Sequence, residues 1–363
     1  MVSPEKKRKN KMEEPSPRLQ IFSQNPSLPH DLLMTCMARV SRLYYPTLSL
    51  VSKSFRSLLA SPDLNKARSL LRNTERCLYV CLQYSRYNSE SCRLYTLCRK
   101  PDQTLAIKEK KNKKSSGYVF ARVPMHLPRD VGSPVLVAVG SSIYNIGFIC
   151  DTAPVSSNVS ILDCRFHTWH ETKIKRVERT SLSASVIDQK IYVAGNYGDC
   201  LVDMYKVFDT ETHVWNPLPT HPCGKTGFRV LASKTECFDG NFHVNTYDGV
   251  CCYNPKEGRW DKAKPGISRA YFSEPSCKID NVMFMVSNGG IMWFDTNVSK
   301  WINLKGLVGL PRLPLRASVR MVNYGGNIVV LWEESLPSSV EKKIWCGEIS
   351  FEMRENGEFG GES

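Results

Sequence analysis

The most constraining feature of this chain is an acidic or amide residue placed six positions before a tryptophan, which occurs four times. Successive tryptophans of these pairs are 46, 45 and 41 residues apart. A repeat of this length is typical of propeller blades, because one blade buries its faces only against neighbouring blades. The pairs are Asp163 with Trp169, Asp209 with Trp215, Asn254 with Trp260, and Asp295 with Trp301.

Each repeat has the same order of short segments. An apolar run such as Ile191-Tyr192-Val193 comes first, a turn rich in Gly, Asn and Asp follows, and the acid-to-tryptophan segment ends the unit. Short β-prone runs separated by turn residues predict antiparallel strands. The tryptophan offers a large apolar body with one N–H, which suits a wedge between blades. A fifth, divergent unit covers residues 317–350 and lacks the spaced pair.

The segment before the repeats has helical rather than strand periodicity. In residues 27–72, apolar residues recur at spacings of three and four, and Ser61-Pro62 matches a helix N-cap followed by a first-turn proline. This predicts three or four short helices. A module of this size cannot bury all of its apolar residues by itself, so a surplus apolar face predicts a partner.

The remaining segments are assigned from composition. Residues 1–26 are polar and are expected to be disordered, and their cluster Lys6–Lys11 fits either a nuclear import signal or a solvated charged tail. Residues 73–100 contain two predicted strands, which we expect to complete a blade with Ile344–Ser350. Residues 101–117 are predicted to be a basic loop, and residues 353–363 a polar tail.

Composition narrows the class of protein. The 363 residues carry a net charge of +14, and no run of 18 apolar residues occurs, so no membrane span is expected. The start shows no signal peptide, and the 14 cysteines lack the spacing of a disulfide framework. We therefore expect reduced thiols in a protein of the nucleus, the cytoplasm or both. The basic residues lack the aromatic interleaving of an RNA-binding sheet, so no nucleic-acid partner is expected.

The helical segment resembles an F-box, through Leu28-Pro29, Leu32-Leu33 and the run Leu48–Arg56, and the repeats resemble kelch repeats. Together they are similar to the large plant family of F-box/kelch-repeat proteins. The resemblance implies a mainly β fold: a kelch-type β-propeller over residues 73–352, with six blades expected and five or seven as alternatives, after a small α-helical F-box at residues 27–72.

The resemblance also implies partners. F-boxes of this family bind a Skp-type adaptor, which attaches them to a cullin ubiquitin ligase, and the propeller would bind the target protein. The implied adaptor-binding residues are Leu28, Pro29, Leu32, Leu33, Leu48, Val51, Ser52 and Phe55. Phe55 replaces the tryptophan of many F-boxes, so weaker binding at most is expected. The alternative for this set is that it forms only the module's own core.

Three classes of function remain open. A non-catalytic receptor subunit of a ligase is the leading hypothesis, an interaction scaffold without a ligase is the second, and a kelch-type copper oxidase is the remote third. Cys164, His167 and His170 have metal-compatible side chains but no matching partners in the sequence, so no metal and no cofactor are expected. No phosphate-binding loop or catalytic signature occurs in the sequence.

Overall fold

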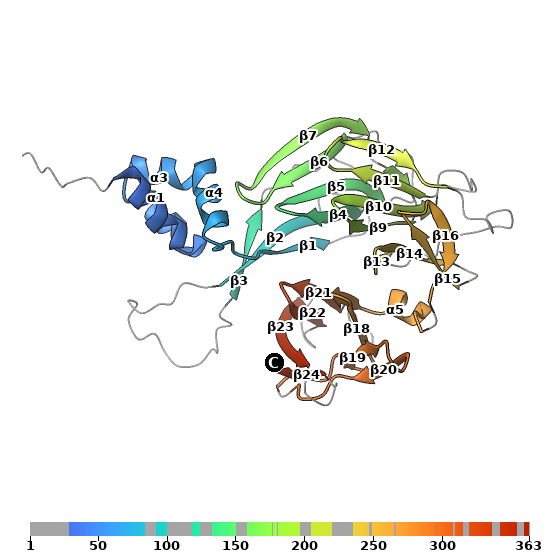
Figure 1. Ribbon diagram of the computed structural model, residues 1–363. Helices are drawn as coiled ribbons and strands as arrows, with labels where there is room; N and C mark the ends of the chain where they lie inside the picture. Colours follow the sequence, from blue (N-terminus) through green and yellow to red (C-terminus); the bar gives the residue numbers. More distant parts are fainter. Residues whose placement is uncertain are drawn as a thin grey trace, which may run out of the picture. The chain divides into compact units, whose positions relative to one another are not determined.

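The computed structural model of the chain divides into two compact units, residues 1–74 and residues 75–363. In Figure 1 the first unit is the group of blue helices and the second unit contains all the strands. The structure describes residues 29–83, 92–99, 118–123, 133–149, 158–175, 177–179, 181–196, 205–219, 235–246, 249–264, 266–307, 309–314, 319–335, 342–353 and 359–362.

The first unit consists of short helices, as predicted. Proline and serine set several of their ends: Pro29 is the N-cap residue of the first helix, and the hydroxyls of Ser52 and Ser61 accept hydrogen bonds of 3.1 Å from the backbone N–H groups of Phe55 and Asp63. The helices are α1 (His30–Arg39), the 3-10 helix η1 (Arg42–Tyr44), α2 (Tyr45–Leu48), α3 (Lys53–Leu59) and α4 (Pro62–Leu70).

A small apolar core and one buried arginine hold the helical unit together. Met37, Ala38, Leu58 and Leu64 are buried. The Arg68 guanidinium donates to the backbone carbonyl of Val40 at 2.6 Å and to the Tyr45 hydroxyl at 3.0 Å. Because these bonds join α4 to the segment after α1, they set the helices in place with few apolar residues.

The second unit is a six-bladed β-propeller built from six sheets, in which all strand pairs except β5 with β8 are antiparallel. The first sheet contains β1 (Leu78–Gln83), β2 (Cys92–Arg99) and β3 (Tyr118–Val123); the second contains β4 (Ser133–Val139), β5 (Ser142–Ile149), β6 (Asn158–Asp163) and β7 (Thr168–Lys175), with β8 (Val177–Arg179) parallel to β5; the third contains β9 (Ser181–Ile187), β10 (Lys190–Asn196), β11 (Tyr205–Asp209) and β12 (Val214–Pro217).

The other three blades follow the same order along the chain. The fourth contains β13 (Glu236–Phe238), β14 (Asn241–Thr246), β15 (Gly249–Asn254) and β16 (Arg259–Lys262); the fifth follows helix α5 (Arg269–Ser273) and contains β17 (Ser276–Ile279), β18 (Val282–Ser287), β19 (Gly290–Asp295) and β20 (Lys300–Asn303); the sixth contains β21 (Arg320–Tyr324), β22 (Asn327–Ser335), β23 (Lys342–Met353) and β24 (Phe359–Glu362).

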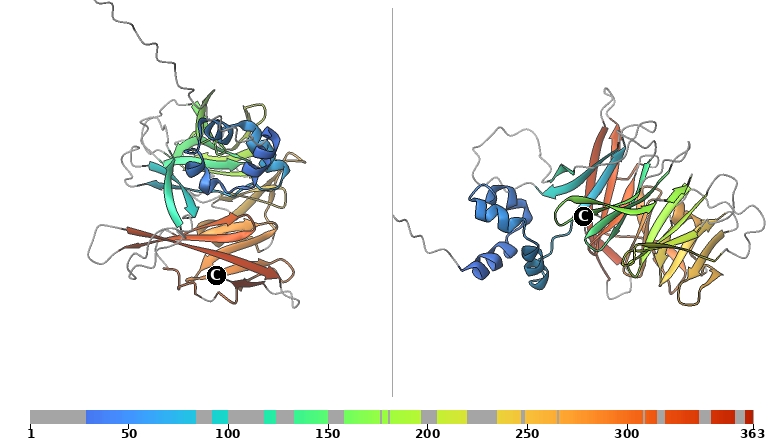
Figure 2. Two further views of the ribbon diagram at one scale, coloured as in Figure 1. Left: turned by 90° about the vertical axis from the view of Figure 1, so that its left-hand side faces the viewer. Right: turned by 90° about the horizontal axis from the view of Figure 1, so that it is seen from above.

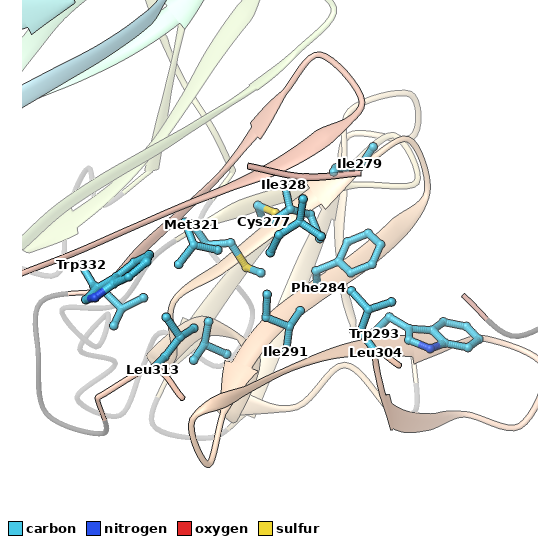
Figure 3. Packing of buried hydrophobic residues seen from close by; sticks show 14 residues of the cluster. Cys277, Ile279, Phe284, Ile291, Trp293, Leu304, Leu313, Met321, Ile328 and Trp332 are labelled. Carbon is cyan, nitrogen blue, oxygen red and sulfur yellow. The ribbon is translucent and has the colours of Figure 1, made fainter. Parts of the chain in front are cut away.

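Buried apolar clusters join each blade to the next. Figure 3 shows the largest of them, in which Phe284 and Ile291 of the fifth blade meet Met321, Ile328 and Trp332 of the sixth. The last interface closes the ring, because Leu78 of β1 packs against Val329 and Leu331 of β22. Figure 2 shows the cyan strands of the first blade beside the red strands of the sixth.

Two predictions about the ends of the propeller are wrong. The strands of residues 73–100 do not share a blade with Ile344–Ser350: β2 pairs with β1 on one side and with β3 on the other. Among the described residues no strand pairing joins the first and sixth blades, which meet through side-chain packing and a hydrogen bond of 3.0 Å from the Tyr324 hydroxyl to the Arg76 carbonyl. The segment 353–363 is not only a polar tail, because Phe359–Glu362 pair with residues 350–353 as β24. An outer strand gains main-chain hydrogen bonds without apolar alternation, so its composition does not reveal it.

The four acid-to-tryptophan pairs have one geometry. Each acid or amide ends the third strand of its blade, and its side chain accepts hydrogen bonds from the backbone N–H groups two and, in three blades, three positions later. The residue four positions later has positive φ in every case: His167, His213, Gly258 and Ser299. The spacing of six is therefore the length of one capped hairpin.

The tryptophans fill the interfaces between blades, as predicted. Trp169, Trp215, Trp260 and Trp301 each belong to the apolar cluster shared with the preceding blade. The indole N–H of Trp260 donates to the backbone carbonyl of Pro219, which follows β12 of that preceding blade, at 2.7 Å. The repeat thus couples a hairpin turn to blade packing.

Replacing Asn254 by Ala is expected to lower the free energy of unfolding by about 1 kcal/mol, because the side chain caps the backbone N–H groups of Lys256 and Glu257 at 2.9 and 3.3 Å. Asn254→Asp keeps the acceptor oxygen and is the matched control. Urea unfolding measures both variants. Equal losses for Ala and Asp would show that the acceptor has no part in stability.

Candidate functional site

The predicted adaptor-binding residues divide into exposed and packed side chains. Leu32 on α1 and Val51 between α2 and α3 are 53% and 63% exposed, and Pro29 and Ser52 are also exposed. Ser52 serves as the N-cap of α3. Leu28 lies outside the described residues.

Leu33, Leu48 and Phe55 are only half-buried and pack against the module's own core. Leu32 and Val51 are large apolar side chains that this core leaves to solvent. The helical unit therefore uses part of the predicted set for its own packing and leaves another part exposed to solvent.

The structure exposes further apolar side chains that the predicted adaptor-binding set does not include. Leu50 is 77% exposed and precedes Val51 in the segment after α2, and Tyr44 ends η1. Leu70 and Leu71, at the end of α4, are exposed as well. Helical spacing identifies the stripe that packs inward, so residues in the short turns between helices escape that pattern.

The two rims of the propeller carry different kinds of turn and connection. At one rim lie the turns that join the first strand of a blade to the second and the third strand to the fourth. In the third and fourth blades the first of these turns has two residues and the second has four. The opposite rim carries the turns between second and third strands and the connections between blades. We call it the connection rim; its described part includes α5, Gly289 and Leu313.

Connections and turns bind each other on the connection rim. Arg269 of α5 donates to the carbonyl of Thr246 at 2.7 Å, and the Leu313 N–H donates to the carbonyl of Gly289 at 3.1 Å. Gly289 has φ +79°, and a Cβ there would lie 2.9 Å from the Leu313 carbonyl oxygen, so only glycine allows this approach. The rim therefore holds its described connections rigidly.

Buried polar groups join the fourth and fifth blades beneath α5. The Tyr271 hydroxyl donates to a Glu236 carboxylate oxygen at 3.1 Å, and the Lys278 ammonium donates to the Cys237 carbonyl at 2.6 Å. His243 is 3% exposed, and its Nδ1 donates to the Asn241 carbonyl at 3.2 Å. Burial lowers the pKa of His243 to about 4, although Glu236 and Asp239 oppose this shift.

Folding stability should fall as the pH falls from about 6.5 to about 4, because His243 in the unfolded chain binds a proton there while the buried imidazole does not. The full loss from this residue is about 3 kcal/mol. Urea unfolding of the wild type and of His243→Gln across this range measures it. The variant should show a shallower slope, and equal slopes would contradict the assignment.

Other predicted positions show no catalytic grouping. His167 lies in the hairpin turn after Asp163, and its Nε2 is 2.9 Å from the hydroxyl of Tyr79 on β1. Cys164 begins the same turn, and His170 lies on β7. Within the described residues, no cluster of three or more His, Cys, Asp or Glu side chains suits a metal ion. The same part of the chain contains no helix long and apolar enough to cross a membrane. Lys6–Lys11 and residues 101–117 lie outside it.

The geometry defines a structural class: a small helical unit followed in the chain by a six-bladed β-propeller. Residues 26–67 match the F-box domain family, and residues 94–363 match the Kelch-repeats domain family FKB95. An F-box/kelch-repeat protein of Arabidopsis thaliana is 51% identical over 346 residues, covering 92% of this chain and 93% of the relative. A second from the same plant is 45% identical over 374 residues, covering 99% and 94%. The chain belongs to the F-box/kelch-repeat family.

Membership in this family supports a general class of function. F-box domains generally bind Skp-type adaptors, and an F-box joined to kelch repeats is the arrangement of a substrate-adaptor protein of the Skp–cullin–F-box type.

Proposed function

We propose that this chain is the substrate-recognition subunit of a cullin ubiquitin ligase. The observation that carries the proposal is the exposed apolar set Leu32, Leu50 and Val51 on a helical unit that matches the F-box family. Large apolar side chains left to solvent by a folded module are a typical docking surface for another protein. The helical unit would bind a Skp-type adaptor and, through it, a cullin.

The propeller would bind the target protein, and we assign that role to the connection rim. The opposite rim is built from short turns whose side chains are used for capping, as at Asp209 and Asn254. Connections tolerate sequence change better than such turns, so specificity for a target is best placed there. The chain would contribute proximity: it would hold the target's lysines near the conjugating enzyme and raise their effective concentration.

A pull-down with a purified Skp-type adaptor tests this proposal, using the full chain and a version that lacks residues 27–72. Adaptor bound by the full chain alone is the expected result. If neither protein binds the adaptor, the ligase role is wrong and the chain is better described as an interaction scaffold. Stoichiometric copper in the purified protein would favour an oxidase of the kelch type instead.

We also propose that the protein works in the nucleus, the cytoplasm or both. The motivation is the basic cluster Lys6–Lys11 together with 14 cysteines that lack disulfide-framework spacing. A fluorescent fusion in which these lysines and Arg8 are replaced by Ala should lose nuclear signal. Secretion of the wild-type fusion would contradict the proposal.

A further inference from the structure

The third strand of the sixth blade is longer than either of the strands that pair with it. β23 has 12 residues and β22 has nine, whereas the third strands β11, β15 and β19 have five or six. Figure 2 shows this red hairpin extending past the other strands of its blade. The extra length gives the sixth blade a surface that the third to fifth blades lack.

The two neighbours of β23 bind different halves of it. β22 pairs with residues 342–349 in an unbroken register, and β24 pairs with residues 350–353. In the fourth and fifth blades the outer strand overlaps the part of the third strand that pairs with the second strand. Among the described residues, no strand pairs with the outer side of Lys342–Ile349, which we call the β23 edge.

The register identifies the main-chain groups that face outward on the β23 edge. β21 and β22 are joined by the two-residue turn Gly325-Gly326, so Tyr324 and Asn327 form a hydrogen-bonded pair. Successive residues of a strand direct their main-chain groups to opposite sides. The groups of Asn327 face β21, so those of Trp332, five positions later, face β23, and Trp332 with Trp345 is a hydrogen-bonded pair. The N–H and C=O groups directed away from β22 are therefore those of the alternate residues Lys342, Ile344, Cys346 and Glu348.

This edge is long and regular compared with the other outer edges. β12, β16, β20 and β24 have four residues each and β3 has six, and short edge strands resist pairing with other chains. β7 has eight residues, but a register shift interrupts its pairing with β6, and the Thr172 hydroxyl donates to the Val159 carbonyl there. The β23 edge has no such interruption over its eight residues.

The side chains beside the edge form a rigid contact surface. Trp345 is 46% exposed and stacks on Trp332, with ring centroids 6.4 Å apart and an interplanar angle of 14°. The Trp345 indole N–H donates to a Glu334 carboxylate oxygen at 2.6 Å, which fixes the ring. Lys342 pairs with Glu333 at 2.8 Å, and the neighbouring Lys343 is exposed.

We propose that the β23 edge binds an extended segment of the target protein by strand addition. The outward main-chain groups fit a peptide backbone, Trp345 fits an apolar side chain of that peptide, and Lys343, two residues from Trp345 on the same face of β23, fits an acidic residue at one end. The inference rests on the proposed role of the propeller in target binding.

The test uses the full chain and fluorescent ten-residue peptides of alternating Thr and Val, with one central Leu and two Asp residues at one end or the other. We expect one of the two peptides to bind, as measured by fluorescence anisotropy. Cys346→Pro removes an outward N–H and should weaken binding at least tenfold, whereas Cys346→Val keeps the N–H and should stay within twofold. Trp345→Ala should weaken binding about fivefold.

A second form of the probe keeps the test valid if Cys346→Pro does not fold. The same peptide N-methylated at alternate residues cannot complete the main-chain ladder, so its binding to the wild type should be lost. Equal binding of methylated and unmethylated peptides, or none by either, overturns the inference. If the wild type forms dimers that Cys346→Pro abolishes, the edge binds a second copy of the chain, and the inference is overturned as well. Adaptor pull-down from the same preparation separates these outcomes from failure of the proposed function.

Discussion

Replacing both Leu32 and Val51 by Ala will weaken adaptor binding by about 4 kcal/mol, or roughly 1,000-fold in Kd. Each side chain is more than half exposed in the free protein, so an adaptor that covers both would bury them on binding. Truncating a buried apolar anchor costs about 2 kcal/mol, and the two losses should add because the residues lie on separate segments of the module. Isothermal titration of the full chain with the adaptor measures the change.

The exposed pair gives a cleaner test than Leu33 or Phe55. Those two side chains pack against the module's core, so their truncation would lower folding stability together with adaptor binding. Leu32→Ala with Val51→Ala should leave the melting temperature of the chain nearly unchanged. Leu70→Ala is the matched control, since Leu70 is exposed but lies outside the predicted adaptor-binding set. Unchanged affinity in the double variant would remove these residues from the adaptor-binding face.

The repeats were predictable because their signal is local. The six-residue spacing from Asp209 to Trp215 encodes one hairpin: the carboxylate caps the turn, His213 takes the left-handed conformation, and Trp215 returns to the strand beside Phe208. Such a turn needs only neighbouring residues, so it survives as a pattern in the sequence. Burial of the tryptophan then follows from the need of each blade for a neighbour.

The ends of the propeller were not predictable in the same way. Strand β1 pairs with β2 and packs on β22 through Leu78 and Val329, which are 251 positions apart in the chain. No periodicity specifies which distant strand a segment will meet. β3 and β24 were missed as strands for a related reason: each lies at one end of the strand order of its sheet and pairs with one neighbour. An outer strand does not need the apolar alternation of a central one.

The candidate site was predictable in its location but not in its detail. The run Leu48–Arg56 correctly marked the region of the F-box family, yet the same pattern mixed Phe55, which packs inward, with Val51, which is exposed. Helical spacing describes one stripe of a helix, and exposure depends on how the helices pack together. Leu50 and Tyr44 lie between helices or at a helix end, where that spacing does not apply.

Phe284→Ala is expected to lower the free energy of unfolding by about 4 kcal/mol. Phe284 of β18 is fully buried in the cluster that joins the fifth and sixth blades (Figure 3), and its ring centroid lies 4.7 Å from that of Phe351 on β23. Removing the ring leaves a cavity that the two sheets cannot fill, because each is held by its own ladder of hydrogen bonds. Urea unfolding followed by tryptophan fluorescence measures the loss.

Phe284→Leu separates the volume of the ring from its chemistry. Leucine retains much of the buried apolar volume, so its loss should be near 1 kcal/mol. In a closed ring each interface supports the next, so we expect the Ala variant to unfold in one transition at lower urea. If Phe284→Ala instead shows a separate early transition, and the rest of the fluorescence change occurs at the urea concentration at which the wild type unfolds, the blades unfold independently. In that case the closing contact of Leu78 with Val329 would not couple the two ends of the propeller.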